Sequence, residues 1–134
     1  MKVMFICKHN RFRSKVAESI FANYANGRHQ VRSRGLIIDM DVHPNVKKAL
    51  KSIGVKLKVD GSRSLSVEDF NWADIEVIVA DDVPKKLFLQ YDTKIIVWKI
   101  RDTHQTNYKG ILARVKDIEK RVKKLVEELD NKKY

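Results

Sequence analysis

The stretch Val3-Met4-Phe5-Ile6-Cys7-Lys8-His9-Asn10-Arg11-Phe12-Arg13-Ser14 decides the fold of this chain of 134 residues. Its apolar beginning predicts a short buried strand, the mostly polar residues 8–12 predict a tight loop, and a helix is expected to begin near Ser14. The unpaired N–H groups at the start of a helix, and the positive end of its dipole, point back into such a loop. The order strand, loop and helix therefore predicts a bowl that binds a small anion, and phosphate fits that description.

Cys7 stands at the end of the apolar run and is the only cysteine in the chain, and Arg13 follows six positions later. This C-x5-R spacing lets a loop curl so that a thiolate and a guanidinium face the same anion. The guanidinium and the helix dipole favour the thiolate, which is the nucleophilic form of cysteine. Ser14 can donate a hydrogen bond to the thiolate, and Asn10 can brace the loop because asparagine tolerates left-handed backbone. The alternative interpretation is a buried thiol at a strand end with no chemical role.

The pattern Phe5-Ile6-Cys7-x-x-Asn10-x-x-Arg13-Ser14, followed by Ala17-Glu18, resembles the signature of low-molecular-weight protein tyrosine phosphatases and of the arsenate reductases that share their fold. Phosphoryl transfer through cysteine would then use Cys7 as the nucleophile. Arg13 and the backbone N–H groups of residues 8 to 13 would hold the phosphoryl oxygens, and Ser14 would steady the thiolate. The residues expected to bind the substrate within this loop are Lys8, His9, Asn10, Arg11, Phe12 and Ser14.

Asp102 is the expected general acid, which protonates the leaving oxygen and later activates the water that cleaves the phosphocysteine. In the resembled family this aspartate is usually followed by proline, in a loop after the last strand, whereas Thr103 follows it here. Asp81 and Asp82 are the alternative acids, and one of them is expected to cap the turn that contains Pro84. Three aspartates are thus open for this role, with Asp102 preferred.

The loop from Leu36 to Val42 corresponds to a region that forms part of the wall beside the bowl in the resembled family. Leu36, Ile37 and His43 are therefore candidates for substrate contact. The alternative is that Leu36 and Ile37 simply close over the core.

Strand and helix patterns alternate along the chain, which predicts a single α/β domain over residues 1–134 with a four-stranded parallel sheet and helices on both faces, as in the low-molecular-weight phosphatases. The expected strands are residues 3–6, 31–35, 75–80 and 95–98, and the expected helices run from Ser14 to Gly27, from Pro44 to Gly54, after Ser66, after Pro84 and over 111–129. Parallel sheets place their sites at the C-terminal ends of strands, so the Cys7 loop, Asp81-Asp82 and Arg101-Asp102 should meet at one edge. The apolar spacing of the last helix fits packing on the sheet, with dimerisation through a coiled coil as the alternative.

Lysine and arginine outnumber aspartate and glutamate by 28 to 17, which gives a net charge of +11 and a pI near 9.8. Such a charge speeds the approach of anionic substrates. The chain contains no helix-turn-helix, zinc-finger or aromatic RNA-binding motif, so no specific nucleic-acid partner is expected. No apolar run is long enough to span a bilayer and no signal-peptide pattern begins the chain, so no membrane partner is expected either.

A lone cysteine forms no internal disulfide, which suits a reducing compartment, so a cytoplasmic protein is expected. A monomer is also expected, since the last helix is needed to cover the sheet. No cluster of histidine, cysteine and carboxylate residues has the spacing of a metal site, so neither a metal nor another cofactor is expected.

These patterns together predict a cysteine-dependent phosphatase that hydrolyses phosphomonoesters through a phosphocysteine intermediate. The expected partner is a phosphorylated protein or a small phosphoester, with protein phosphotyrosine preferred. One alternative is an arsenate reductase that uses an external thiol, because the thioredoxin-coupled enzymes of this type pass electrons through further cysteines and this chain has none. Another is a phosphocysteine carrier or a phosphate-binding module that does not hydrolyse its ligand.

Overall fold

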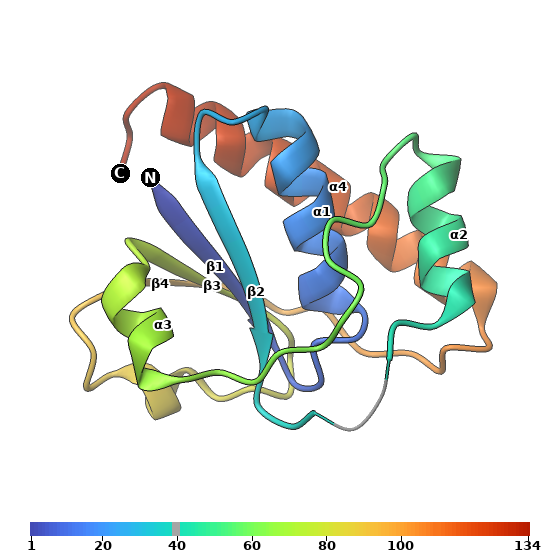
Figure 1. Ribbon diagram of the computed structural model, residues 1–134, viewed down its shortest axis with the longest axis horizontal. Helices are drawn as coiled ribbons and strands as arrows, with labels where there is room; N and C mark the ends of the chain where they lie inside the picture. The colour runs from blue at the N-terminus through green and yellow to red at the C-terminus, as the bar shows by residue number, and fades with distance from the viewer. Residues whose placement is uncertain (39–40) are drawn as a thin grey trace.

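The computed structural model describes residues 1–38 and 41–134; Asp39 and Met40, which belong to the predicted wall loop, lie outside the described residues. Four strands form one sheet (Figure 1): β1 (Lys2–Cys7), β2 (Gln30–Gly35), β3 (Ile75–Val79) and β4 (Lys94–Trp98). They are hydrogen-bonded in the order β2-β1-β3-β4, and each neighbouring pair is parallel. The predicted four-stranded parallel sheet is therefore confirmed.

Helices cover both faces of the sheet, as predicted (Figure 1). The elements between and after the strands are α1 (Arg13–Ala25), α2 (Pro44–Ser52), α3 (Val67–Trp72), the 3-10 helix η1 (Lys85–Phe88) and α4 (Tyr108–Asp130). α1 and α4 pack against each other over one face, with α2 beside them against α4. Phe70 of α3 and Phe88 of η1 are buried on the other face.

The central strand β1 separates two hydrophobic clusters because its side chains alternate between the faces. Val3 and Phe5 belong to the cluster beneath α1 and α4, whereas Met4 and Ile6 belong to the cluster beneath α3 and η1. All five residues of β3 are buried, and the strand ends one residue earlier than the predicted 75–80. The two central strands therefore lie inside the protein.

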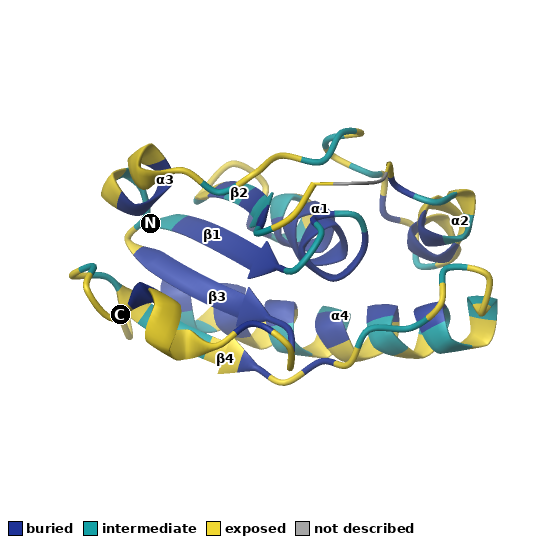
Figure 2. Cartoon of the chain, turned by 90° about the horizontal axis from the view of Figure 1, so that it is seen from below, coloured by how far each residue is buried: buried dark blue, intermediate teal, exposed yellow. Residues whose placement is uncertain are grey.

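The apolar residues of α4 pack inside the protein. The buried residues of this helix are Ile111, Val115, Ile118, Val122, Leu125, Val126 and Leu129. Figure 2 shows buried residues on the side of α4 that faces the sheet and exposed residues on the opposite side. Packing on α1 and the sheet thus accounts for the stripe without a coiled coil.

Three chain segments meet at the C-terminal edge of the sheet, as the parallel topology requires. Cys7 ends β1, residues 80–84 follow β3, and residues 99–102 follow β4. The Asp81 N–H donates to the Ile100 carbonyl at 3.1 Å, which joins the second and third segments. Within the described ranges, no helix is long and apolar enough to cross a membrane.

Candidate active site

The loop between β1 and α1 is fixed by Asn10. Its backbone has a φ of 52°, in the left-handed region that asparagine tolerates better than most residues. The buried side chain accepts a hydrogen bond from the Arg63 N–H at 2.8 Å and donates one to Ser14 Oγ at 2.7 Å. The Ser62 hydroxyl also donates to the Asn10 carbonyl at 2.8 Å. Asn10 is therefore a brace for the loop rather than a ligand-facing side chain.

Gly35, at the end of β2, lets the loop lie close to the sheet. A Cβ atom at this position would lie 2.7 Å from the backbone nitrogen of Asn10 and 2.8 Å from the carbonyl carbon of His9. These are backbone atoms and cannot swing away as the end of a side chain can. The loop conformation thus depends on a glycine that the sequence pattern around Cys7 does not include.

The Cys7 thiol lies at the floor of the loop and is directly hydrogen-bonded to Ser14. The two side chains meet with Cys7 Sγ and Ser14 Oγ 2.9 Å apart, and the Ser14 N–H donates to the same sulfur at 3.4 Å. The Asn10 amide donates to Ser14 Oγ, which leaves the hydroxyl proton of Ser14 available to an ionised sulfur. The hydroxyl and the N–H of Ser14 thus both lie where they can donate to a Cys7 thiolate.

Arg13 is held in place by the two segments that follow β3 and β4. Its guanidinium donates to the Ile100 carbonyl at 2.9 Å and to both carboxylate oxygens of Asp82, at 2.9 and 3.2 Å. Asp81 Oδ1 lies 3.6 Å from the same guanidinium. The side chain is only 2 % exposed, so these contacts fix its direction.

The prediction that Asp81 or Asp82 caps the turn at Pro84 was wrong. η1 begins after Pro84 without a side-chain cap, and Asp82 instead pairs with Arg13. The physical reason is the buried guanidinium, which needs a carboxylate more than the short and exposed 3-10 turn does.

Asp102 lies beside the loop and faces Arg11. The Arg11 guanidinium and the Asp102 carboxylate are 3.9 Å apart, and the Asp102 side chain is 30 % exposed. The Thr103 N–H donates to the other carboxylate oxygen at 2.9 Å, a bond that proline at this position could not make. The aspartate is thus oriented by its own loop while remaining open to solvent.

A cavity of about 540 Å³ adjoins Asp102 and the loop. It is lined by Arg11, His43, Asp102, Thr103, His104, Gln105 and Thr106. His43 caps α2, where its Nδ1 accepts the Asn45 N–H at 3.0 Å, and the Asn45 side chain donates to the Gln105 carbonyl at 2.9 Å. The Asp102 segment and the start of α2 therefore form one wall of the candidate site.

The other residues predicted to contact substrate differ in how far they are exposed. The Phe12 side chain is 1 % exposed and belongs to the hydrophobic core beneath α1, so its predicted contact with substrate is possible only through the backbone. Lys8 and His9 are half-buried, and the Lys8 carbonyl accepts hydrogen bonds from the N–H groups of Leu36 and Ile37. Ile37 is 49 % exposed, as a substrate wall requires, whereas Leu36 packs against the core beneath α3.

Several residues of the site were not found from the sequence: Gly35, Ser62, Arg63 and Asp82 in its supporting role. Each acts through a contact with a residue far away in the chain, so the local pattern held no signal for three of them. A glycine at the end of a predicted strand was a signal for close approach of another segment. Among the residues that the structure describes, no group of three histidine, cysteine or carboxylate side chains is arranged to hold a metal ion.

Comparison with known proteins agrees with this geometry. The family model described as low molecular weight phosphotyrosine protein phosphatase matches residues 2–134. A glutaredoxin arsenate reductase from Synechocystis sp. is 34 % identical over 79 residues, which is 59 % of this chain and 58 % of that protein. The chain is also similar to two solved structures. An arsenate reductase from Archaeoglobus fulgidus is 29 % identical, with a TM-score of 0.75 and coverage of 94 % of this chain and 99 % of that one.

The second structure is a low molecular weight phosphotyrosine phosphatase from Vibrio cholerae O395. It has a TM-score of 0.89 and covers 98 % of both chains, but at 18 % identity it supports the fold alone. The match of the family model over nearly the whole length, with Cys7, Arg13 and Ser14 assembled around one loop, decides the assignment. This chain belongs to the low molecular weight phosphotyrosine protein phosphatase family.

Proposed function

We propose that this protein hydrolyses phosphomonoesters through a phosphocysteine intermediate on Cys7. The observation that supports this most is the hydrogen bond between Cys7 Sγ and Ser14 Oγ at 2.9 Å, at the floor of a loop that Arg13 closes. A thiol that was merely buried would have no need of two converging donors and a fixed guanidinium. Membership of the family supports the same reading.

In the first step the Cys7 thiolate attacks phosphorus and the ester P–O bond breaks. Arg13 and the backbone N–H groups of the loop hold the equatorial oxygens as negative charge shifts onto them. Asp102, in its protonated form, gives its proton to the departing alcohol oxygen. The enzyme then holds a phosphocysteine and an ionised Asp102.

In the second step water attacks phosphorus and the S–P bond breaks. The Asp102 carboxylate takes a proton from the water, which returns the aspartate to its starting form. Inorganic phosphate leaves, and the Ser14 hydroxyl stabilises the thiolate that is set free. We assign the acid role to Asp102 rather than Asp82 because Asp82 is engaged by Arg13.

Phosphotyrosine in a protein is the substrate we propose. The cavity of about 540 Å³ beside the loop offers room for the part of the substrate that carries the phosphate. Ile37 and Ile38, in the segment after β2, are 49 % and 41 % exposed and offer an apolar surface against which an aromatic ring can pack. The lone cysteine suits a reducing, cytoplasmic setting.

The proposal is tested with a simple aryl phosphate and a chelator. Full activity should persist in the chelator, because no step uses a metal ion. Cys7→Ser should abolish turnover while inorganic phosphate or vanadate still binds, since the loop and Arg13 remain. A Cys7→Ser protein with substantial turnover would remove Cys7 from the mechanism.

Arsenate reduction with an external thiol is the second candidate, and the similarity to an arsenate reductase at 29 % identity favours it over a non-hydrolytic carrier. Cys7 would form a thioester with arsenate and release water. A first external thiol would attack the sulfur of Cys7, so that arsenite leaves with two electrons and a mixed disulfide remains. A second thiol would release Cys7. Arsenite production that requires glutathione would support this route, and rapid production with the thioredoxin system alone would rank reduction above hydrolysis.

A further inference from the structure

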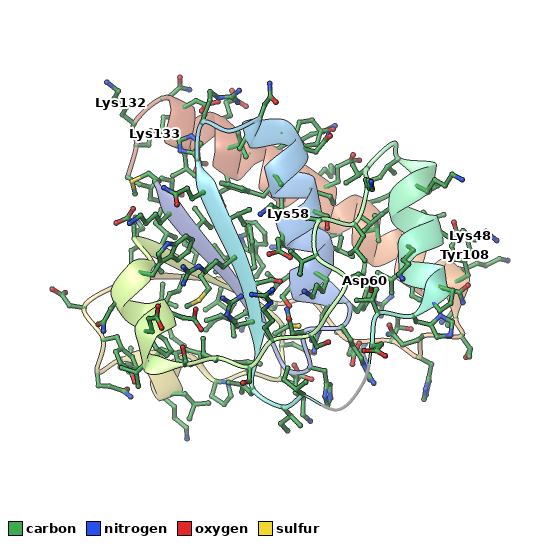
Figure 3. The ribbon with its side chains drawn as sticks, viewed as in Figure 1. Lys48, Lys58, Asp60, Tyr108, Lys132 and Lys133 are labelled. Carbon is green, nitrogen blue, oxygen red and sulfur yellow. The ribbon has the colours of Figure 1, made fainter. Side chains whose placement is uncertain are left out.

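A second polar cavity, of about 450 Å³, lies between α1, β2 and the segment before α3. Its lining residues are Lys15, Glu18, Val31, Arg32, Arg34, Lys58, Val59, Arg63, Ser64, Ser66, Glu68 and Asp69. The segment that carries Lys58 passes along α1 (Figure 3), and the Lys58 N–H donates to Ser19 Oγ at 3.0 Å. None of the residues proposed for catalysis lines this cavity.

Two of the five cations that line the cavity share one carboxylate within the protein. Arg32 and Arg34 both pair with Asp69, at 3.2 and 3.0 Å. The ion pairs formed among the described residues leave Lys58 and Arg63 without a carboxylate within 4.0 Å, and both side chains are exposed at this cavity. The positive charge at the cavity is therefore free to meet a ligand.

Lys15 is the buried cation of this cavity. It is 1 % exposed, and its ammonium lies 3.9 Å from Glu18 Oε1, beyond hydrogen-bond distance. That oxygen instead accepts the Ser33 hydroxyl at 2.9 Å. Glu18 is therefore the partner of this ammonium by charge alone, and Lys15 lines the cavity. A bound oxyanion would give the ammonium hydrogen-bond acceptors and a second opposite charge.

The charges around Lys15 also favour the binding of an anion. Burial lowers the pKa of Lys15, the carboxylate of Glu18 opposes that effect, and the guanidinium groups of Arg63 and Arg34 lower the pKa further. An anion placed among these cations would relieve both the burial and the repulsion. A metal cation would be repelled, because the Lys15 ammonium already lies beside the Glu18 carboxylate.

We propose that this cavity is a second oxyanion site, in which Lys15, Lys58 and Arg63 bind inorganic phosphate. Lys15 forms the floor, and the two exposed side chains close over the anion from the mouth. The Arg63 backbone N–H also braces Asn10 in the catalytic loop, at 2.8 Å. Variants at position 63 keep that N–H, so the side chain can be tested without removing the brace.

Equilibrium dialysis of the full chain against orthophosphate counts the bound anions. We expect two phosphates per wild-type chain, one in the Cys7 loop and one in the cavity. Lys15→Met, which keeps an unbranched side chain of similar volume, should bind one. The double variant Lys58→Gln/Arg63→Gln changes only exposed side chains and should weaken the second phosphate at least tenfold.

Lys48→Gln is the matched control. Lys48 lies on α2 over the ring of Tyr108, at 4.5 Å, away from this cavity (Figure 3), so its loss should leave both phosphates bound. If the Cys7 loop fails to bind phosphate, the wild type should bind one phosphate and Lys15→Met none, which separates this inference from the proposed function. If Lys15→Met and the double variant both bind as many phosphates as the wild type, with unchanged affinity, the second site is overturned.

Discussion

The most quantitative prediction concerns Glu76, a carboxylate in the middle of β3. Glu76 is fully buried, and neither of its carboxylate oxygens has a hydrogen-bond partner among the described residues. In the sheet it lies between Met4 of β1 and Ile95 of β4, on the face covered by α3. Burial raises the pKa of Glu76 from 4.5 to about 7. Folding therefore favours the protonated form of this side chain.

The sign of the pH dependence follows from this shift. Between pH 4.5 and about 7 the folded protein holds a proton on Glu76 that the unfolded chain has released, so the free energy of unfolding falls as the pH rises. Above about pH 8 the loss is complete. Each pH unit corresponds to about 1.36 kcal/mol, so the loss is on the order of 3 kcal/mol.

Replacing Glu76 by glutamine removes this titration. Urea unfolding of the wild type and of Glu76→Gln at several pH values from 5 to 8.5 gives the two free-energy curves. We expect their difference to change by about 2–3 kcal/mol over this range in favour of the variant at high pH. The test compares how the free energy of unfolding changes with pH, not its absolute value. The buried amide of glutamine lowers the free energy of unfolding by about 1–3 kcal/mol at every pH, which shifts the curve without changing its slope.

Glu127→Gln is the control, because Glu127 is an exposed residue of α4 and its replacement should leave the pH dependence as in the wild type. Parallel curves for the wild type and Glu76→Gln would refute the reasoning, since they would mean that the buried carboxylate does not exchange a proton on folding.

Three further predictions concern the catalytic loop. Asp102→Asn should slow esters with poor leaving groups by about 10²–10⁴-fold and esters with good leaving groups far less, and the same pattern in Asp81→Asn instead would move the acid to the earlier loop. Gly35→Ala should lower kcat/KM at least tenfold and reduce the free energy of unfolding by about 1–3 kcal/mol, because the new Cβ would lie 2.7 Å from the Asn10 nitrogen; unchanged kinetics would show that the loop can move aside. Peroxide should inactivate the enzyme by oxidising Cys7, with protection by phosphate and recovery in added thiol only early in the time course; intact mass should show the sulfinic acid in the unrecoverable fraction, and inactivation without any change of mass would contradict this.

Local patterns in the sequence were sufficient to predict the elements of the fold. The apolar run before Cys7 and the apolar stripe from Ile111 to Leu129 each lie within a single element. Their side-chain periodicity depends only on the geometry of strands and helices, so it can be read without knowing how elements pack. The alternation of such elements was enough to predict a parallel sheet and the edge at which its loops meet.

Tertiary structure alone decided which residues support the loop at that edge. Asp82 reaches Arg13 across 69 positions of the chain, and the Arg63 N–H reaches Asn10 across 53. These contacts exist because the strand order β2-β1-β3-β4 brings the ends of β1 and β3 together and leads the segment after α2 past the end of β2. Phe12 turned into the core for the same reason, since its direction depends on what α1 covers. Local periodicity states which face of an element is apolar, but it does not state which distant segment will lie against that face.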